Sequence, residues 1–301
     1  MKKIIGLLIV SFICFITWIG LSSAKNSSQS EVVVFTSNKK SEKQEKTKVY
    51  SSNYLLMDLS DNQVLLEKNR HQKVPIASLT KIMTAYILLE EEQDLTKKIL
   101  VDGAIIDQLT SDGASMAGFM REDEVSIRDI AYAILLPSGG EAAELAAKHV
   151  AGSEKNFVHL MNEYAHKMGL QETNFKNTTG LDVKGHYSSV SDISQLLKQA
   201  LKNEHFYQIF TTLEYTTEPT LYEPNGYFLK STLLRDGNQL ALNNGKIVGG
   251  KTGYTQKAGL CLASVAEKNG TTYLLVTVGA KGDSFSEQYN VMDAVNIYNL
   301  L

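Results

Sequence analysis

The sequence is poor in the residues that could hold a chain together without a packed core. It has only two cysteines and four prolines in 301 residues, which excludes a disulfide framework and a proline-rich or collagen-like chain. Hydrophobic residues make up 43% and charged residues 21%, so the chain is not intrinsically disordered. The length allows one large domain or two small ones, and either could bury a full core.

The two cysteines are not expected to stabilise the folded part by pairing. Cys14 lies in an apolar run near the N-terminus and lacks the small residue before it that a lipoprotein signal would show. Cys261 is then the only cysteine in the folded part. Its apolar neighbours predict that it is a small buried hydrophobic residue.

Positive charge is concentrated near the N-terminus. Residues 1–48 hold 8 of the 30 Lys and Arg residues but only 3 of the 33 acidic residues. The rest of the chain therefore carries 22 minus 30, or −8. This acidic balance argues against nucleic acid as a partner, because nucleic-acid binding depends on cationic contacts to phosphate.

The N-terminus opens with two lysines and continues as an apolar run from Ile4 to Leu21. This length lies between a signal-peptide core of about 7 to 15 residues and a membrane-spanning helix of about 18 or more. A small-x-small cleavage site follows at Ser22 to Ala24, whereas the long run and Trp18 favour a retained anchor. We predict that residues 1–24 are a signal peptide or membrane anchor and that most of the chain lies outside the cytoplasm.

Residues 25–48 are rich in Ser, Asn, Gln, Lys and Glu, and we interpret them as a polar linker. The folded domain is then residues 49–301. Hairpins are predicted at both of its ends, with turns at Ser60–Gln63 and Lys268–Gly270. Between them the apolar spacing becomes helical, in residues 79–89, 127–136, 142–150, 157–168 and 193–201, and a last amphipathic stretch follows at 287–300.

This order of elements predicts an α/β fold of the α+β type. Strands at both ends of the domain would form one antiparallel sheet, flanked by helices, with a mainly helical subdomain inserted between them.

The segment from Pro75 to Thr84 contains the first candidate for covalent catalysis. Pro75 and the small residues after it mark a helix start, and Ser78 and Lys81 are three positions apart on one helical face. A partly desolvated lysine can lose its proton and act as a base for the serine hydroxyl. The simpler alternative is an N-capping serine followed by a surface lysine, and S-x-x-K alone does not decide between them.

A second candidate is Ser138, in a loop between two helical stretches. It is followed by Gly139, Gly140 and Glu141. The alternative here is a structural one, in which Ser138 caps the next helix and Glu141 completes a capping box.

The third candidate is the glycine-rich segment Val248–Tyr254. Its glycines would let a substrate backbone approach an edge strand, and Lys251 and Thr252 would offer a charge and a hydroxyl to a carboxylate. Residues 245–252 also match the phosphate-binding pattern G-x-x-x-x-G-K-[ST]. We reject that match, because the flanking sequence predicts neither a buried strand before the loop nor a helix starting at the lysine.

Three residues of the helical stretch 157–168 could bind a metal. His159, Glu163 and His166 share one helical face, but a solvated face is the favoured interpretation, and no fourth ligand is evident. We expect no metal and no organic cofactor, because serine, lysine and backbone donors can supply the whole chemistry.

Taken together and in order, Ser78-x-x-Lys81, Ser138-Gly139-Gly140 and Lys251-Thr252-Gly253 resemble the three motifs of penicillin-binding proteins and serine β-lactamases. The surrounding segments are most similar to the D-alanyl-D-alanine carboxypeptidases, the low-molecular-mass penicillin-binding proteins. The resemblance covers roughly residues 49–280. It implies a β-lactamase/DD-peptidase-like fold with the active site between the sheet and a helical subdomain.

The resemblance also implies roles in catalysis. Ser78 would attack the carbonyl between the terminal D-alanines of a peptidoglycan stem pentapeptide, Lys81 would take its proton, and Ser138 would relay a proton to the leaving amine. β-Lactam antibiotics would acylate the same serine.

Substrate binding is implied for the third motif. Lys251 and Thr252 would hold the terminal carboxylate of the peptide, next to Gly253. Backbone N–H groups of Ser78 and Tyr254 would form the oxyanion hole.

The sequence departs from the family pattern at Gly140, where the second motif usually ends in an asparagine that contacts the substrate and the motif lysine. We expect slower acylation or a shifted substrate preference, and Gly140→Asn is expected to raise the acylation rate. A second departure is that the chain stops soon after its last helix, whereas many relatives continue into a β-rich domain and a C-terminal anchor. The N-terminal segment is then the expected membrane attachment.

Two other functions stay open. A serine β-lactamase needs an activated water, usually held by a Glu-x-x-Leu-Asn pattern. Residues 218–222 match this pattern only in part. A catalytically silent penicillin-binding or wall-binding module is compatible with Gly140. Acylation of Ser78 would distinguish the enzyme from the silent module.

Overall fold

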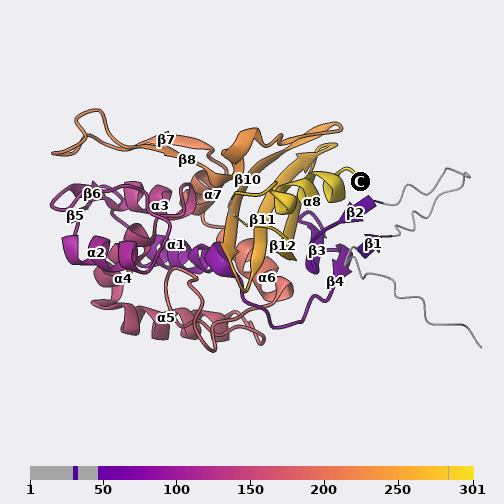
Figure 1. Ribbon diagram of the computed structural model, residues 1–301, viewed down its shortest axis with the longest axis horizontal. Helices are drawn as coiled ribbons and strands as arrows, with labels where there is room; N and C mark the ends of the chain where they lie inside the picture. The colour runs from indigo at the N-terminus through magenta and orange to yellow at the C-terminus, as the bar shows by residue number, and fades with distance from the viewer. Residues whose placement is uncertain (1–29, 33–46, 284) are drawn as a thin grey trace, which may run out of the picture.

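A six-stranded antiparallel sheet forms the centre of the molecule (Figure 1). The computed structural model describes residues 30–32, 47–283 and 285–301. The strand order is β4-β3-β12-β11-β10-β9. The strands are β3 (Asn53–Asp58), β4 (Val64–Lys68), β9 (Ala241–Leu242), β10 (Gly245–Thr255), β11 (Gly259–Lys268) and β12 (Thr271–Ala280).

Both predicted hairpins are confirmed. Asn269 and Gly270 connect β11 to β12 with positive φ angles of 52° and 80°, as a tight two-residue turn between right-twisted strands requires. β3 pairs with β4 on one side and with β12 on the other, so Leu56 faces Leu275 across the ladder. The sheet is therefore closed by strands from the two ends of the domain, as the sequence predicts.

The helices lie mostly between these two groups of strands in the sequence. All six predicted helical stretches are present, with bounds that differ by a few residues. The described helices are η1 (Ala77–Leu79), α1 (Thr80–Glu91), α2 (Gly103–Ser111), α3 (Ile127–Leu135), α4 (Gly140–Ala151), α5 (Glu154–Lys167), α6 (Val190–Ala200), α7 (Glu204–Phe210), η2 (Thr232–Gly237) and α8 (Tyr289–Tyr298).

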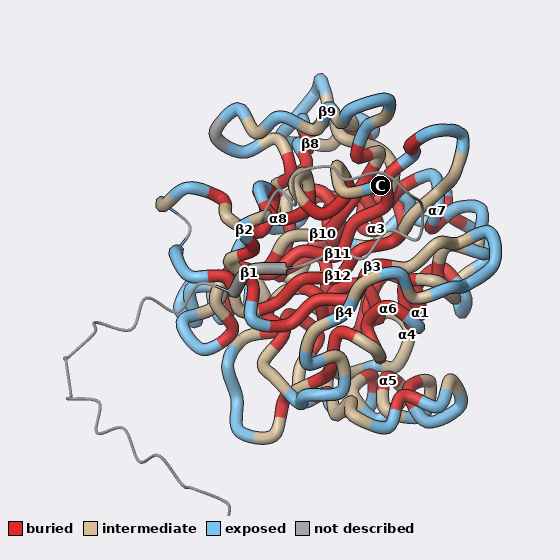
Figure 2. Tube along the Cα trace, turned by 90° about the vertical axis from the view of Figure 1, so that its right-hand side faces the viewer, coloured by how far each residue is buried: buried red, intermediate tan, exposed pale blue. Residues whose placement is uncertain are grey.

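The sheet separates two hydrophobic cores. On one face, α8 packs Val291, Ala294 and Ile297 against sheet residues that include Leu262 and Leu275. On the other face lies the larger core, which joins the sheet to the helices α1 and α3–α7. Figure 2 shows the result, with buried strands at the centre and exposed segments around them. The alternation of buried side chains along β11 and β12 is what assigns each to one core or the other.

Several elements were not predicted. They include the helices α2 and α7 and two pairs of short strands, β5 (Lys98–Leu100) with β6 (Glu124–Ser126) and β7 (Glu214–Thr216) with β8 (Phe228–Lys230). The strands have three residues each, too few for an alternating pattern to stand out. Helix α2 buries only Leu109, so its apolar face is weak, although Asp102 caps it by accepting a hydrogen bond from the backbone N–H of Ala104.

The start of the domain is tied to its last helix. The buried carboxylate of Asp293 in α8 accepts hydrogen bonds from the backbone N–H groups of Tyr50 and Ser51, at 2.8 and 2.7 Å, and from the Ser51 hydroxyl at 2.6 Å. Just before them, β2 (Thr47–Val49) pairs with β1 (Ser30–Val32), both largely within the predicted linker. The predicted signal or anchor, residues 1–24, lies outside the described residues. Within the described part, no helix has the length and apolarity needed to span a membrane.

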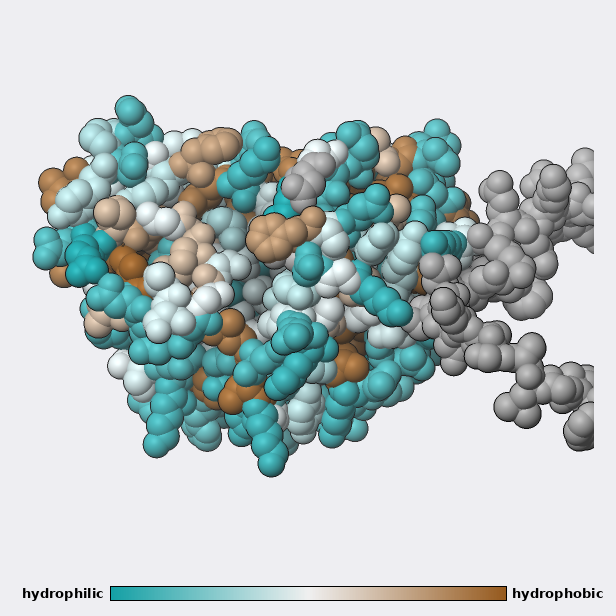
Figure 3. Space-filling model, in the orientation of Figure 1, coloured by the Kyte–Doolittle hydropathy of each residue, from teal (hydrophilic) through white to brown (hydrophobic). Residues whose placement is uncertain are grey.

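The surface is mainly hydrophilic on the face drawn in Figure 3, where apolar residues occur in small separate groups. Cys261 is fully buried in β11 as a free thiol, which confirms the expected small core residue.

Candidate active site

Ser78 lies in η1, a one-turn 3-10 helix that leads directly into α1. The residue before it, Ala77, has a φ of +46°, a left-handed conformation that costs energy for any residue except glycine. Thr80 supports this turn by donating a hydrogen bond to the Ala77 carbonyl at 2.9 Å, and Thr80 in turn contacts Nε2 of buried His186 at 2.8 Å. The backbone at the candidate nucleophile is thus held in a strained shape by its surroundings.

Lys81 is buried, with 1% of its surface exposed, and it faces the serine. Its Nζ donates to Ser78 Oγ at 3.3 Å and to the carbonyl oxygen of Thr179 at 2.8 Å. Burial lowers the pKa of Lys81 to about 7, although the nearby Glu141 carboxylate acts in the opposite direction. The alternative of a capping serine and a surface lysine is therefore wrong, and no side-chain cap is present at η1.

Ser138 lies in the turn between α3 and α4, with a φ of +71° and 4% exposure. Its hydroxyl oxygen accepts a hydrogen bond from Lys251 Nζ at 2.8 Å, across 113 positions of sequence. The capping-box alternative is wrong, because Gly139 is the N-cap of α4 and makes no side-chain cap. Glu141 instead accepts hydrogen bonds from a distant loop.

Lys251 and Thr252 lie in the middle of β10. Lys251 is fully buried, and its pKa is far below the ordinary value because of burial, with the positive charges of Lys81 and Arg235 adding to the effect. The Thr252 hydroxyl donates to Thr232 Oγ1 at 2.6 Å.

The strand β10 runs without a break through Gly245–Thr255, so no helix begins at the lysine, and the phosphate-loop match fails on structure as well. β9 pairs only with Gly245 and Lys246 at one end of β10. In the described chain, the part of β10 beyond residue 247 therefore has no strand pairing on that side. This leaves an edge along which an extended peptide could lie.

Gly253 brings β10 against the serine. A Cβ atom built at Gly253 would lie 2.9 Å from the backbone nitrogen of Ser78, so only glycine allows this approach. Tyr254 follows it and is 36% exposed. The two backbone N–H groups predicted to form an oxyanion hole are therefore carried by segments in contact with each other.

The structure thus brings together residues of all three sequence motifs. Ser78 pairs with Lys81 and Ser138 pairs with Lys251, and the two lysines are close enough for the charge of Lys81 to affect Lys251. Gly140, the remaining predicted site residue, has no side chain to offer. Its backbone N–H donates to the Ser115 carbonyl at 2.7 Å.

Sequence reasoning missed several residues that complete the site. Thr179 contributes only a backbone carbonyl, which no motif can reveal, and Thr232 contacts Thr252 across 20 positions. The signal for Glu141 was present, an acid at the start of a helix, but it was assigned to a local cap.

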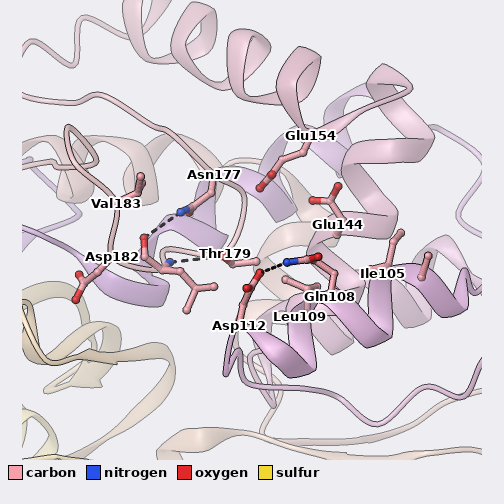
Figure 4. A pocket seen from close by; sticks show the side chains of 12 residues that line it. Ile105, Gln108, Leu109, Asp112, Glu144, Glu154, Asn177, Thr179, Asp182 and Val183 are labelled. Carbon is pink, nitrogen blue, oxygen red and sulfur yellow. Dashed lines mark hydrogen bonds between the residues drawn. The ribbon is translucent and has the colours of Figure 1, made fainter.

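A cavity of about 850 Å³ lies beyond Thr179 (Figure 4). Ser78 does not line this cavity. Thr179, whose carbonyl contacts Lys81, and Leu181 do line it. The carboxylates of Glu144 and Glu154 lie close together at this cavity. Burial, with the charge of Glu154, raises the pKa of Glu144 to about 7.

The histidines on α5 are not buried in the way that Lys81 and Lys251 are. His159 is exposed and lies 3.2 Å from the Glu163 carboxylate, as expected for a solvated helix face. Among the described residues, no group of three or more potential ligands is arranged to hold a metal.

A family model described as D-alanyl-D-alanine carboxypeptidase matches residues 38–282, most of the chain. The chain belongs to this family. Among its relatives, the carboxypeptidase DacC of Escherichia coli K12 is 34% identical over 238 residues, which are 76% of this chain and 56% of that protein. DacF of Bacillus subtilis strain 168 is 32% identical over 226 residues, 75% of this chain and 56% of that protein.

The chain therefore spans a little over half the length of these curated family members. The crystal structure of the Streptomyces K15 DD-transpeptidase has a TM-score of 0.73 at 26% identity, and the match covers 83% of this chain and 96% of that one. These likenesses confirm the expected DD-peptidase-like fold.

Proposed function

We propose that the protein is a serine-type D-Ala-D-Ala carboxypeptidase that removes the terminal D-alanine from peptidoglycan stem pentapeptides. The observation that carries this proposal is the Ser78–Lys81 pair, in which a buried amine lies 3.3 Å from the serine hydroxyl. A pKa of about 7 makes a large share of Lys81 neutral at neutral pH, so it can accept a proton. Family membership supports the same activity.

Acylation begins when neutral Lys81 accepts the hydroxyl proton and Ser78 Oγ attacks the carbonyl carbon of the scissile peptide bond. Negative charge develops on the carbonyl oxygen, where the N–H groups of Ser78 and Tyr254 meet it, each donor contributing about 3 to 4 kcal/mol. The carbon–nitrogen bond then breaks. Ser138 passes the proton from Lys81 to the amine, so that Lys81 is neutral again, and D-alanine leaves with the shortened peptide esterified to Ser78.

The terminal carboxylate of the substrate binds beside β10. Lys251 and the hydroxyls of Thr252 and Thr232 are the groups that receive it, and Arg235 adds positive charge. Lys251 lacks an ion-pair partner among the described residues. An arriving carboxylate would therefore stabilise the charged form of Lys251, which its surroundings in the protein disfavour.

Water completes the cycle by attacking the ester: Lys81 takes a proton from the water and returns it to Ser78 Oγ as the ester bond breaks, which regenerates both residues. An amine could replace water as acceptor, which would make the reaction a transfer. The similar Streptomyces K15 structure, described as a DD-transpeptidase, favours this as the second candidate activity.

The two other functions have less support. Glu218, from the partial β-lactamase pattern, lies in the connection between β7 and β8 and pairs with Lys98 at 3.4 Å. A silent wall-binding module would not need a buried lysine on the nucleophile. We place the enzyme outside the cytoplasm, attached to the membrane or exported through residues 1–24, with β-lactams as inhibitors.

The test uses purified protein with a fluorescent penicillin and with a peptide ending in D-Ala-D-Ala. We expect a covalent label that depends on Ser78 and is lost slowly, together with release of D-alanine. Ser78→Ala is the control for labelling. Adding glycine as an amine acceptor separates transfer from hydrolysis through the product formed.

Three outcomes would change the assignment. Rapid turnover of penicillin would move the protein to the β-lactamases. Neither label nor D-alanine release from folded protein would make it a silent module. Labelling that persists in Ser78→Ala would place the nucleophile elsewhere.

A further inference from the structure

Glu141 is a buried carboxylate with no role in the chemistry described so far. It is the second residue of α4, three positions after Ser138, and is 0% exposed. Its Oε1 accepts hydrogen bonds from the backbone N–H groups of Ala117 and Gly118, at 2.7 and 2.8 Å. Its Oε2 is buried and has no hydrogen-bond partner within the described part of the chain. Such a group is costly to bury, so its position needs an explanation.

The segment that Glu141 holds packs on the second motif. A Cβ atom at Gly139 would lie 2.8 Å from the Ala117 Cβ, and one at Gly140 would lie 3.1 Å from the Ala114 Cβ and 3.2 Å from the Ser115 carbonyl oxygen. Gly140 also donates its backbone N–H to that carbonyl at 2.7 Å. The space into which a side chain at position 140 would start is therefore filled by residues 114–117.

We propose that Glu141 is a positioning residue that holds the segment 114–119 against Gly139 and Gly140, so that this segment forms the part of the site wall that an asparagine at position 140 would form. A docked backbone segment then takes the place that the asparagine side chain would fill. The inference rests on the proposed function only in assigning this wall to an active site.

Glu141 also acts on the catalytic lysine through its charge. The charged groups that bear on Lys81 are Glu141 from α4 and Lys251 from β10, while Ser78 and the Thr179 carbonyl are its hydrogen-bond partners. Glu141 raises the pKa of Lys81 against the larger effect of burial. Removing the carboxylate charge therefore lowers this pKa further, and Lys81 stays neutral to lower pH.

The experiment compares Glu141→Gln, Glu141→Ala and a matched control, Asp293→Asn. Gln keeps an acceptor oxygen for the 117–118 amides but loses the charge, whereas Ala loses both. Asp293 is also a buried carboxylate that accepts two backbone N–H groups from a remote segment, but it lies on the other face of the sheet. Asp293→Asn therefore removes a similar buried carboxylate charge, but far from the site.

The first readout is hydrogen exchange of the Ala117 and Gly118 amides in the purified full chain, which needs no activity. We expect exchange to be at least about tenfold faster in Glu141→Ala than in the wild type, because a charge-assisted hydrogen bond is lost. Glu141→Gln should remain closer to the wild type, and Asp293→Asn should leave these two amides unchanged. Equal exchange in the wild type and Glu141→Ala would overturn the proposal.

The second readout is the rate of acylation by fluorescent penicillin as a function of pH. Glu141→Gln should move the acidic limb of this profile to lower pH, by about half a unit to one unit, and Asp293→Asn should not move it. An acidic limb that stays in place in Glu141→Gln would contradict the action on Lys81. If the wild type itself is not acylated, the proposed function fails, while the exchange measurement still decides the position of the segment.

Discussion

The helical region and the sheet each contribute one buried lysine to the site, and the two lysines have different surroundings. Lys81, from α1, bonds to Ser78 and to a backbone carbonyl and has a carboxylate, Glu141, nearby. Lys251, from β10, bonds to Ser138 and to its neighbour's carbonyl, but only positive charges bear on it. Burial is the same for both, so the difference comes from their neighbours.

We propose that this difference gives the two lysines different tasks. A carboxylate near Lys81 limits the fall of its pKa, which stays near 7, where a lysine can both accept and return a proton. Lys251 lacks such compensation within the described residues, so the group that best stabilises its charge is an anion from outside. One lysine is suited to proton transfer and the other to recognising a carboxylate.

The largest expected effect comes from removing the proton acceptor. Lys81→Met should slow acylation of Ser78 by about 10²- to 10⁴-fold with every substrate, because general base catalysis contributes that much. The measurement is the second-order rate of penicillin labelling, with circular dichroism to verify folding. Acylation at the wild-type rate would remove Lys81 from the proposed chemistry.

A smaller and more selective effect is expected at the other lysine. Lys251→Met should raise the KM for a D-Ala-D-Ala peptide by roughly 10- to 100-fold, because a charge-assisted hydrogen bond to the carboxylate is lost. The matched comparison uses the same peptide with a C-terminal amide, for which the substitution should change KM far less. An equal loss with both peptides would mean that Lys251 does not recognise the carboxylate.

The third prediction concerns Gly140, where the structure reverses the effect expected from the sequence. The sequence alone led us to expect faster acylation in Gly140→Asn, but the new side chain would start against Ala114 and the Ser115 carbonyl. We now expect it to displace the segment that Glu141 holds and to slow acylation by about tenfold, which is roughly 1.4 kcal/mol in the barrier. Gly140→Ala, which adds only the Cβ, should have a smaller effect. Faster acylation in Gly140→Asn would restore the first expectation.

The smallest effect is on stability, one helical turn beyond Glu141. The pKa of Glu144 is raised to about 7 in the folded state, so this state holds the proton more tightly than the unfolded chain. The free energy of unfolding therefore decreases as pH rises from about 4.5 to about 7.

Glu144→Gln should remove this penalty. The variant should be more stable than the wild type above pH 7, by on the order of 1 kcal/mol because the partly exposed group is screened, and should show no gain near pH 4. Urea unfolding at both pH values measures this gain in stability, with Glu163→Gln, at an exposed position of α5, as the control. A gain that does not depend on pH would point to packing instead of charge.

The parts of this structure that depend on local patterns could be predicted from the sequence. The hairpin turn at Asn269-Gly270 and the spacing of Ser78 and Lys81 are readable because a few neighbouring residues determine them. What escaped is non-local: the carbonyl of Thr179 is 98 positions from the lysine it contacts, and the amides that Glu141 binds are 23 and 24 positions away. Gly140 shows the limit most clearly, because a glycine's function lies in what packs against it.

The pairing of β3 with β12 also has a consequence for how the chain folds. Leu56, near the start of the domain, pairs with Leu275, near its end, so the central sheet cannot close until almost the whole domain has been synthesised. Such distant pairings slow folding because a long loop must be closed before contacts form. Until β12 emerges, the hairpin β3–β4 keeps an open edge. For the export that we propose, this delay would be an advantage, because a chain must still be unfolded while it crosses a membrane.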